Sequence, residues 1–550
     1  MRRYFALLLL GLSFMMAAVA QPVIQSTRPV LNSASYIGPE LVGSGSGIAQ
    51  GSIFALFGSG FGPSDSYAEA TTFPLPTVLG GTYATVTVGG TSTRAILLVV
   101  YYGYQINAVL PSATPTGSGT ITVTYGGVTS APAPIQVVPS SFGIYGLNYS
   151  GNGQAAATDI SYNLNSIIHT FHPGDIAILW GTGLGAVSWD ETQDPSGLPP
   201  ADFVSLAAPV EVYVGNTTAV TGYHGRSGCC AGLDQVVFTV PAGVEGCYVP
   251  VGVKAGAVMS NITTIAISST GQTCSDSILG QDLINQLAAG QNVRFGWIRL
   301  EGGAYIGDYA SATFNEFTPA TASLASYGVS SGYCMALEWG GYNGFFPDDL
   351  TVPYLNAGPP LTLQGTLGSY PLPNSSGLPG SYYSLLDANG PRVLWAGYPF
   401  TVSGAGGPNI GAFTASDTMP VLEGVITNLG QLSTIPRGSD LTVQWVPSQF
   451  AQPNGVATLG GASLILEPDG SVSVFSELQC TVPVAPGQFT IPAWVLSLLP
   501  PSGTTTTSAG PTGYLWLGQW DTPKTFTTTG LDKGIISAIT YSLTYHLIFQ

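Results

Sequence analysis

Charged side chains are scarce in this sequence. Only 7% of its 550 residues are Asp, Glu, Lys or Arg, and only four are His. Disordered chains usually combine high charge with few aromatic residues, whereas 11% of this chain is aromatic. Disorder along the whole chain is therefore excluded. The 73 glycines and 41 prolines predict many tight turns, and together with abundant Thr, Val and Tyr they indicate an all-β fold.

Basic residues are especially few. No segment gathers Lys and Arg into a cluster, and the chain has 29 acidic residues against 12 basic ones. Two of the basic residues lie within the first 20 positions, so a chain without them keeps 10 and carries a formal charge of −19. This charge would repel a polyanion. Nucleic acid is therefore excluded as a partner.

Long apolar runs are absent except at the N-terminus. Two arginines precede an apolar run over 5–16, and a small-x-small pattern ends at Ala20, as in signal peptides that are cleaved during export. We predict a Sec-type signal peptide over 1–20 and a leader over 21–31. No later segment reaches the roughly 18 to 20 apolar residues of a membrane-spanning helix. The sequence therefore predicts a secreted or cell-surface protein without a transmembrane helix.

Cysteine is also rare. The chain contains Cys229, Cys230, Cys247, Cys274, Cys334 and Cys480. An even number in an exported chain favours disulfides, although six cysteines allow 15 pairings. Neighbouring cysteines rarely bridge each other, so we expect the first two to pair with the next two, and the last two to pair together. A metal site is the alternative, but no CxxC spacing is present and histidines are few.

One pattern occurs twice in the first half of the chain. Residues 51–62 return 123 positions later as residues 174–185, with the shared pattern G-x-I-x-x-L-x-G-x-G-x-G. Two further blocks follow in the same order, at 86–90 and 212–216, and at 105–111 and 235–241. Short strands separated by turn formers are typical of β-sandwiches. We therefore predict tandem immunoglobulin-like β-sandwiches over 32–139 and 140–272.

Three glycines close the shared pattern in each copy. They are Gly58, Gly60 and Gly62, and Gly181, Gly183 and Gly185. Dinucleotide-binding proteins also place glycines after an apolar strand, but with the spacing GxGxxG and a following helix. Here the spacing is GxGxG, and residues 63–66 lead into no helical pattern. We interpret these glycines as structural residues at a corner between strand and loop, and we expect no cofactor.

These motifs resemble a family of uncharacterised secreted proteins that is abundant in acidobacteria. The resemblance rests on Asn32-Ser33-Ala34-Ser35, on the two glycine blocks and on the block over 105–111, and it covers roughly 32–270. The halves of that paired module are similar to IPT/TIG immunoglobulin-like domains. The resemblance implies the fold and an extracytoplasmic location, and it supplies no catalytic residue. The segment 229–235 with Cys247 also resembles cysteine-bearing forms of the module, which implies a disulfide there.

The second half of the chain continues as a β-rich region after one helix. A helix is predicted over 275–290, because leucines recur every four residues on one face and Gly290 is placed to end it. We expect a helical connector over 273–290 and a larger β-rich C-terminal domain over 291–550. Its predicted strands are 295–300, 361–365, 398–402, 441–445 and a hairpin over 464–474. A short helix is expected over 492–499.

Hydrolytic machinery finds little support in the sequence. No G-x-S-x-G pattern is present, and the histidines His169, His172, His224 and His546 belong to no catalytic motif. A glycosidase needs two carboxylates and no motif. Its candidates are Glu301, Asp308, Glu316, Glu338, Asp348 and Asp349. Their spacing selects no pair, so no catalytic residue is predicted.

Two features are compatible with non-covalent binding. Asp190, Glu191 and Asp194 offer oxygen ligands for Ca²⁺ in one loop, but they follow no regular ligand pattern and also fit an ordinary acidic loop. Aromatic residues gather with glycine at 101–104 and 339–346, and such rings suit stacking on sugars or packing against a protein. The first patch also fits a packed strand. We expect ligand contacts in the second, from Trp339, Tyr342, Phe345 and Phe346.

These expectations combine into one hypothesis of function. The sequence predicts a secreted or cell-surface modular protein that recognises a glycan or a surface protein without covalent chemistry, or that serves as a structural spacer. A carbohydrate-active hydrolase with its active site in 291–550 is the alternative. An aromatic cleft with two facing carboxyl groups in that domain would favour the hydrolase.

Overall fold

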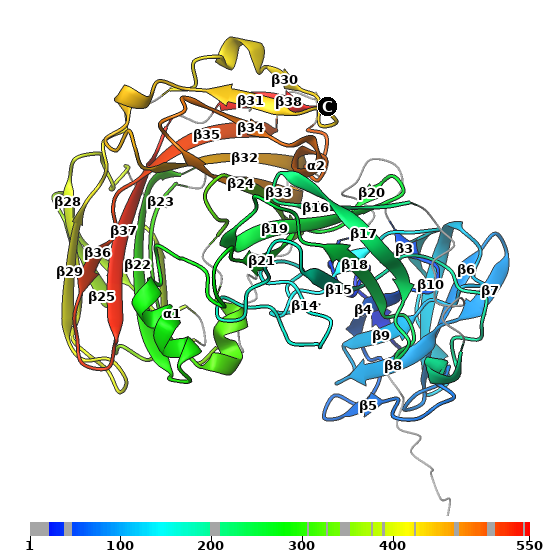
Figure 1. The fold of residues 1–550 in the computed structure, drawn as a ribbon. Helices are drawn as coiled ribbons and strands as arrows, with labels where there is room; N and C mark the ends of the chain where they lie inside the picture. The colour runs from blue at the N-terminus through cyan, green and yellow to red at the C-terminus, as the bar shows by residue number, and fades with distance from the viewer. Residues whose placement is uncertain are drawn as a thin grey trace, which may run out of the picture.

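The structure, a computed structural model, describes residues 21–37, 47–198, 209–304, 307–325, 328–340, 352–375, 378–387, 391–422, 425–466, 472–502, 512–542 and 545–550. The predicted signal peptide lies outside these ranges. In the described part, strands dominate, and the chain passes from two small sandwiches into a large curved sheet (Figure 1). The all-β prediction is confirmed. None of the helices among these residues is long and apolar enough to cross a membrane.

The first sandwich packs two sheets face to face. The described strands of one sheet are β1 (Val23–Ile24), β2 (Val30–Asn32), β4 (Ile53–Ser59), β5 (Tyr67–Glu69), β8 (Ile96–Tyr101) and β9 (Gln105–Val109). Those of the other are β3 (Ile48–Ala49), β6 (Thr82–Val88), β7 (Thr91–Arg94), β10 (Gly117–Tyr125), β11 (Val128–Thr129) and β12 (Ala133–Val138). Alternate side chains meet between the sheets, where Phe54, Leu56, Val86 and Ile121 are buried in one core.

The second sandwich follows the same plan with one difference. Its described strands are β13 (Gly143–Ile144), β14 (Ala157–Thr158), β15 (Ile176–Thr182), β16 (Val210–Val214), β17 (Thr217–Arg226), β18 (Asp234–Thr239), β19 (Gly246–Ala255), β20 (Val258–Met259) and β21 (Thr263–Ile267), and its loop contains the 3-10 helix η1 (Pro195–Gly197). In the first sandwich the chain ends β7 in one sheet and starts β8 in the other. Strand β17 instead runs on without a break, pairing first with β16 and then with β18. One strand therefore belongs to both sheets.

The repeated pattern occupies equivalent strands in the two sandwiches. β4 and β15 cover the same seven positions of the pattern, and their partners β9 and β18 carry the third repeated block. A phenylalanine ring covers the first corner glycine in each copy. A Cβ added at Gly58 or at Gly181 would lie 2.3 Å from the ring of Phe61 or Phe142, respectively. The ring would have to move to admit any side chain, so glycine is required at this position.

The remaining corner glycines serve the backbone. Gly60 and Gly183 have φ values of +69° and +111°, which residues with a Cβ rarely adopt. The third glycines differ between the copies. Gly185 has a φ of +126°, whereas at Gly62 an added Cβ would come within 3.2 Å of Val100. The two corners are thus similar in their first two glycines and not identical in the third.

The C-terminal region forms a large sheet that two small sheets cover. The described strands of the large sheet are β22 (Val293–Ala304), β23 (Gly307–Phe317), β24 (Tyr333–Gly340), β27 (Ser381–Leu385), β30 (Thr434–Ile435), β32 (Val456–Leu466), β33 (Val472–Pro483), β35 (Gly513–Trp520), β36 (Lys524–Phe526), β37 (Lys533–Tyr541) and β38 (Tyr545–Phe549). One cover contains β25 (Leu361–Gly365), β26 (Gly368–Leu372), β28 (Pro399–Gly404) and β29 (Phe413–Thr418), and the other contains β31 (Leu441–Gln444) and β34 (Gln488–Ile491). Short 3-10 helices are η3 (Pro319–Leu324), η4 (Leu429–Gln431) and η5 (Pro447–Gln449). Both covers lie outside the curve of the large sheet, and the second sandwich faces its inside (Figure 1).

The connector helix is shorter than predicted. Helix α1 spans Gln281–Ala288, whereas the leucine spacing predicted a helix over 275–290. Gly280 has a φ of +89°, and the Asp276 carboxylate accepts hydrogen bonds from the two peptides that precede it. These contacts hold a turn where the pattern predicted helix. The C-terminal end fits better, because Gly290 has a φ of +84°, and the second predicted helix is present as α2 (Ala493–Leu496).

The disulfides correct one predicted pairing. Cys229 bonds to its neighbour Cys230, and Cys247 bonds to Cys274, so the expected exchange between these pairs is wrong. Cys247 is buried on β19 with its Cα 5.3 Å from that of Cys274, whereas Cys229 and Cys230 lie exposed in the β17–β18 loop. The fold therefore separates the two sets. The third predicted pair, Cys334 with Cys480, lies directly across the β24–β33 ladder.

A buried ion network joins the two sandwiches. Arg226 at the end of β17 donates from Nη1 to Asp234 Oδ1 at 2.7 Å, and both side chains are 1% exposed. Asp234 Oδ2 accepts the peptide N–H groups of Gly183 and Leu184 at 2.7 and 2.8 Å. Arg226 also lies 4.0 Å from Glu191, whose carboxylate accepts the N–H group of a first-sandwich residue, Ser112.

The buried network leads to a first prediction. Replacing Arg226 by methionine keeps most of its volume but leaves the Asp234 carboxylate buried without its counter-charge. We expect Arg226→Met to lower the free energy of unfolding of the sandwiches by about 3–5 kcal/mol, as measured by urea denaturation.

Arg294→Met is the matched control, because Arg294 pairs with Glu316 on the surface and its side chain is 40% exposed. Loss of an exposed pair should change the stability by about 1 kcal/mol or less. Equal effects of the two substitutions would contradict a structural role for the buried network.

Candidate functional site

A cleft of about 900 Å³ opens between the inside of the large sheet and the second sandwich. The large sheet contributes side chains from four of its strands, namely Trp297, Arg299, Thr458, Gln479, Thr481 and Trp520. The opposite wall comes from the start of β19, the end of β21 and the connector. A smaller hollow of about 220 Å³ meets the cleft at Trp297 and Arg299. Ligand sites of small molecules commonly have volumes of roughly 300–1,000 Å³.

Strand alternation explains which side chains reach the cleft. On β22, Ile298 and Leu300 point into the core beneath the four-stranded cover, so Trp297 and Arg299 point to the inside of the curve. On β33, Leu478 is buried beneath the other cover, and its neighbour Gln479 lines the cleft. Each strand therefore presents one apolar face to a cover and one mixed face to the cleft.

Arg299 lies between two tryptophans on the floor of the cleft. Its Cζ is 4.8 Å from the ring centroid of Trp297 and 5.8 Å from that of Trp520. Both indoles are anchored by hydrogen bonds, from Trp297 Nε1 to Ser537 Oγ at 2.9 Å and from Trp520 Nε1 to Thr458 Oγ1 at 2.8 Å. The anchors fix the orientation of the rings, so the floor is a rigid aromatic surface.

The charge of Arg299 is already balanced by Glu301. The Arg299 guanidinium donates to the Glu301 carboxylate, which is buried and also accepts a hydrogen bond from the Tyr541 hydroxyl at 2.9 Å. Burial alone would lower the pKa of Arg299, but the adjacent carboxylate outweighs it and raises that pKa. Burial, and next the Glu301 charge, raise the pKa values of Tyr309 and Tyr541. The floor is therefore an ion pair surrounded by neutral phenols.

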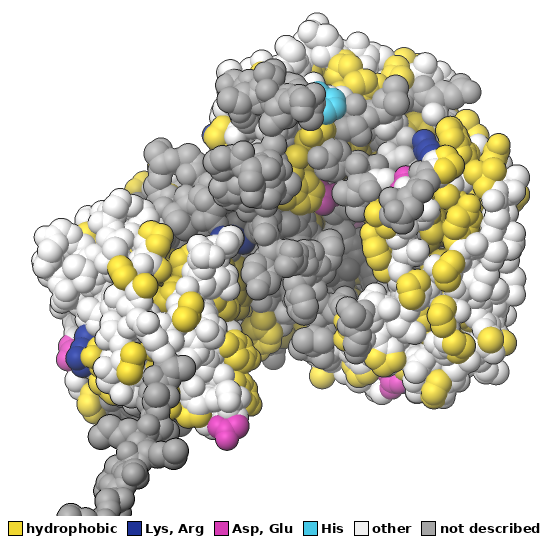
Figure 2. Space-filling view, turned by 180° about the vertical axis from the view of Figure 1, so that it is seen from behind, with side chains coloured by type: hydrophobic (Ala, Val, Ile, Leu, Met, Phe, Trp, Pro, Cys, Tyr) yellow, Lys and Arg dark blue, Asp and Glu magenta, His cyan; other side chains and the backbone are white. Residues whose placement is uncertain are grey.

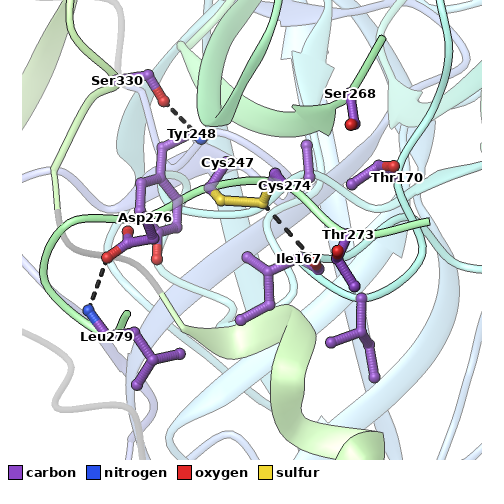
Figure 3. Close-up of a disulfide and its surroundings, with 12 residues drawn as sticks. Ile167, Thr170, Cys247, Tyr248, Ser268, Thr273, Cys274, Asp276, Leu279 and Ser330 are labelled. Atoms are coloured by element: carbon purple, nitrogen blue, oxygen red, sulfur yellow. Dashed lines mark hydrogen bonds between the residues drawn. A yellow bond between two sulfur atoms is a disulfide. The ribbon is translucent and has the colours of Figure 1, made fainter. Parts of the chain in front are cut away.

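The disulfide Cys247–Cys274 secures the opposite wall (Figure 3). Cys274 contacts the Ile167 carbonyl oxygen, and Ser330 Oγ accepts the Tyr248 N–H group at 2.9 Å. The bond joins β19 to the connector just before Asp276, whose carboxylate caps the turn into α1. Several segments that are separate in sequence are thus held against the cleft.

Asp521 at the edge of the cleft has a raised pKa, and a second carboxyl group contributes to it. Burial, and next the hydrogen bond with Asp417, raise the pKa of Asp521 from an ordinary value of 3.8 to about 8. Asp417 is buried and contacts Lys524 Nζ at 2.5 Å, while Asp521 accepts the Ala538 N–H group at 2.8 Å. Burial and the second carboxyl group disfavour the charged form of Asp521, so Asp521 keeps its proton near neutral pH.

This acid pair predicts a pH dependence of stability. The folded-state pKa of Asp521 is raised, so its contribution to the free energy of unfolding is complete below about pH 4. Above that pH the unfolded chain releases the proton and the folded chain retains it, so the contribution is lost as the pH rises towards 8. Asp521→Asn preserves the hydrogen bond to Asp417 without a titrating proton. We expect this variant to lose less stability between pH 5 and pH 8 than the wild type, as measured by urea denaturation at both pH values.

Asp65→Asn changes an exposed turn residue and should leave the pH profile of the wild type unchanged. If Asp521→Asn lost as much stability between pH 5 and pH 8 as the wild type, this result would contradict the raised pKa of Asp521.

The predicted aromatic contacts all lie outside the residues whose side chains the structure describes. Tyr342, Phe345 and Phe346 lie outside the described residues. Trp339 belongs to β24, where its backbone pairs with Phe475, and nothing is described of its side chain. These four expected contacts therefore stay predictions.

The described carboxylate candidates have structural partners. Asp308 is buried and accepts the N–H groups of Gly303, Val393 and Leu394. Glu316 pairs with Arg294 on the surface, and Glu301 pairs with Arg299. The other three, Glu338, Asp348 and Asp349, lie outside the residues whose side chains are described. No pair of facing carboxylates emerges from those that are described.

The acidic loop does not bring its three carboxylates together. Asp190 accepts hydrogen bonds from Thr192, Asp194 caps η1, and Glu191 is buried against Ser112. In the described part of the chain, no three His, Cys, Asp or Glu side chains are grouped as metal ligands. The loop therefore serves as a set of turns and as a bridge to the first sandwich.

Trp297, Arg299 and Trp520 were not predicted from the sequence as site residues. Trp297 and Arg299 belong to β22, and Trp520 belongs to β35. Each strand is apolar on the covered face and mixed on the cleft face, so the sequence of one strand alone does not indicate a site. The only local signal is the alternation in 295–300, where a tryptophan and an arginine share one face.

Comparison with known proteins adds little to this geometry. No protein-family model and no curated protein sequence matches the chain. Among solved structures, SGBP-B of a Bacteroides ovatus mixed-linkage glucan utilization locus, in complex with a mixed-linkage heptasaccharide, is 10% identical over 83% of this chain and 95% of its own, with a TM-score of 0.13. SGBP-B from a complex xyloglucan utilization locus in Bacteroides uniformis is 10% identical over 96% of this chain and 100% of its own, with a TM-score of 0.15.

Domains 5–6 of the S-layer protein SbsC are 14% identical over 46% of this chain and 100% of theirs, with a TM-score of 0.16. At TM-scores this low, these likenesses support no conclusion about a site or a ligand.

Proposed function

We propose that the protein binds a neutral glycan, without covalent chemistry, in the cleft between the large sheet and the second sandwich. The observation that carries this proposal is the fixed Trp297–Arg299–Trp520 surface at its floor. Pyranose rings offer C–H faces that pack on indoles, and hydroxyl groups that bond to polar side chains. Gln479, Thr481 and the serines of the opposite wall supply such groups.

The charges of the cleft favour an uncharged ligand. Among its described lining residues the only base is Arg299, which Glu301 already neutralises, whereas Glu245 and Asp276 are acidic and Asp521 holds its proton near neutral pH. Few charged side chains are visible on the face seen in Figure 2. An anionic glycan would meet unfavourable charge here, so we infer a neutral one.

An extracytoplasmic role fits the cysteines and the two sandwiches. All six cysteines are paired, as is typical of proteins in oxidising compartments. The network around Arg226 holds the sandwiches in one orientation, so they act as a stiff spacer beside the recognition domain. The predicted signal peptide supports the same location.

A glycan hydrolase is the second candidate. Asp521 lines the cleft, and a carboxyl group with a pKa of about 8 holds its proton at neutral pH, as a general acid requires. Release of new reducing ends from a bound glycan, abolished in Asp521→Asn, would favour this candidate over binding alone.

The binding proposal predicts a specific loss of affinity. We expect Trp297→Ala and Trp520→Ala each to weaken binding by roughly five- to tenfold, because each removes one aromatic surface. The measurement is a glycan-array screen of the purified protein, followed by calorimetric titration of the best neutral glycan.

Trp395→Ala is the matched control, since Trp395 is 44% exposed in the same domain and does not line the cleft. Its affinity should equal that of the wild type. Silence on the whole array, or an equal loss in all three variants, would contradict glycan recognition by the cleft and favour the spacer role alone.

A further inference from the structure

A group of exposed tyrosines covers one end of the first sandwich. We call it the tyrosine platform, and its members are Tyr67, Tyr101, Tyr102 and Tyr104. The rings come from β5 and the β8–β9 hairpin of the first sandwich. Figure 1 places β5 and β8 at the opposite end of the molecule from the four-stranded cover. The platform is therefore separate from the cleft.

The rings form a continuous surface. Tyr102 and Tyr104 stack with their planes 12° apart and their centroids 6.2 Å apart. Tyr67 lies 6.5 Å from Tyr101 and 6.2 Å from Tyr102. Tyr67, Tyr102 and Tyr104 are 41–57% exposed.

The glycine corner of the first sandwich supports this surface. Tyr102 and Gly103 form the tip of the β8–β9 hairpin, and the tip packs so tightly on the corner that a Cβ at Gly103 would lie 2.5 Å from the Gly62 carbonyl oxygen. Gly103 also accepts the Phe61 N–H group, and the Tyr104 carbonyl accepts that of Gly58. The hairpin is thus fixed by the backbone, which orients the rings.

One platform tyrosine has a strained backbone. Tyr102 has a φ value of +44°, a region that costs a residue with a Cβ about 1 kcal/mol or more. Asn and Gly adopt this region more readily, so stability alone favours them over Tyr. The stability of the hairpin therefore does not require the exposed Tyr102 ring.

We propose that the tyrosine platform is a second, independent glycan-binding surface, which stacks a neutral polysaccharide with flat pyranose rings. Its rings lie side by side, so an extended chain contacts more than one of them. The phenol hydroxyls at the rim bond to sugar hydroxyls. Glu69 beside Tyr101 and the overall negative charge disfavour a polyanion. Two surfaces on one chain raise the apparent affinity for a long polymer by avidity.

The test uses native affinity gels that contain hydroxyethylcellulose or galactomannan as neutral probes and polygalacturonate as the anionic probe. We expect Tyr102→Asn to weaken retention by the better neutral probe at least fivefold. Because asparagine tolerates positive φ, the melting temperature should stay equal to that of the wild type or rise. A loss of binding without a loss of stability is a result that a purely structural role does not produce.

Tyr162→Asn is the matched control. Tyr162 is 67% exposed and has a φ of +64°, but its ring packs near Trp180, and it is not a member of the platform. Its retention should be that of the wild type. Wild-type retention of Tyr102→Asn, absence of retention by both neutral probes, or stronger retention by polygalacturonate would each overturn the proposal.

The Trp520→Ala background separates the two surfaces. If the platform acts independently, Tyr102→Asn weakens the remaining retention of Trp520→Ala by the same factor as in the wild type. If Trp520→Ala alone abolishes retention, the platform proposal is overturned and the cleft proposal stands. If Trp520→Ala has no effect while Tyr102→Asn does, the cleft proposal fails and the platform stands.

Discussion

The arrangement of the two sandwiches depends on the buried pair of Arg226 and Asp234. The pair closes the last rung between β17 and β18, and the same Asp234 carboxylate holds the N–H groups of the second glycine corner. The guanidinium also donates to the Gly185 carbonyl and faces Glu191, which reaches the first sandwich. A charge of this kind is costly to bury unless every partner is present, so the network stabilises the packed arrangement of the two modules.

The large sheet obeys a different constraint, because it is covered on one face and open on the other. Each small cover buries one set of alternate residues, such as Ile298 and Leu300, and thereby presents the other set to the cleft. Trp297 on β22 and Trp520 on β35 share one floor because both strands pair with β37, which lies between them. The Cys334–Cys480 bond secures the far side of the same sheet.

The features that the sequence predicted well are local ones. The glycine corners could be predicted because the pattern occurs twice, and because a contact that requires glycine, such as the ring over Gly58, comes from a residue nearby in the sequence. The start of α1 could not, because the turn around Asp276 overrides a helical leucine pattern. The cleft depends on the strand order of a sheet whose members are far apart in the chain. The disulfide pairing likewise depends on the fold, because the fold places Cys247 beside Cys274 and away from Cys229 and Cys230.

Low charge and rigid support belong together in this molecule. A neutral, hydroxyl-rich ligand offers little electrostatic attraction, so its affinity depends on aromatic surfaces that lose little entropy when they bind. Indoles anchored by Ser537 and Thr458, and a tyrosine hairpin held on a glycine corner, meet that requirement. A stiff junction between the modules extends the same argument to a polymer, because a fixed separation of two surfaces keeps both available to one chain. Flexibility at the Arg226 network would weaken that cooperation without changing either surface.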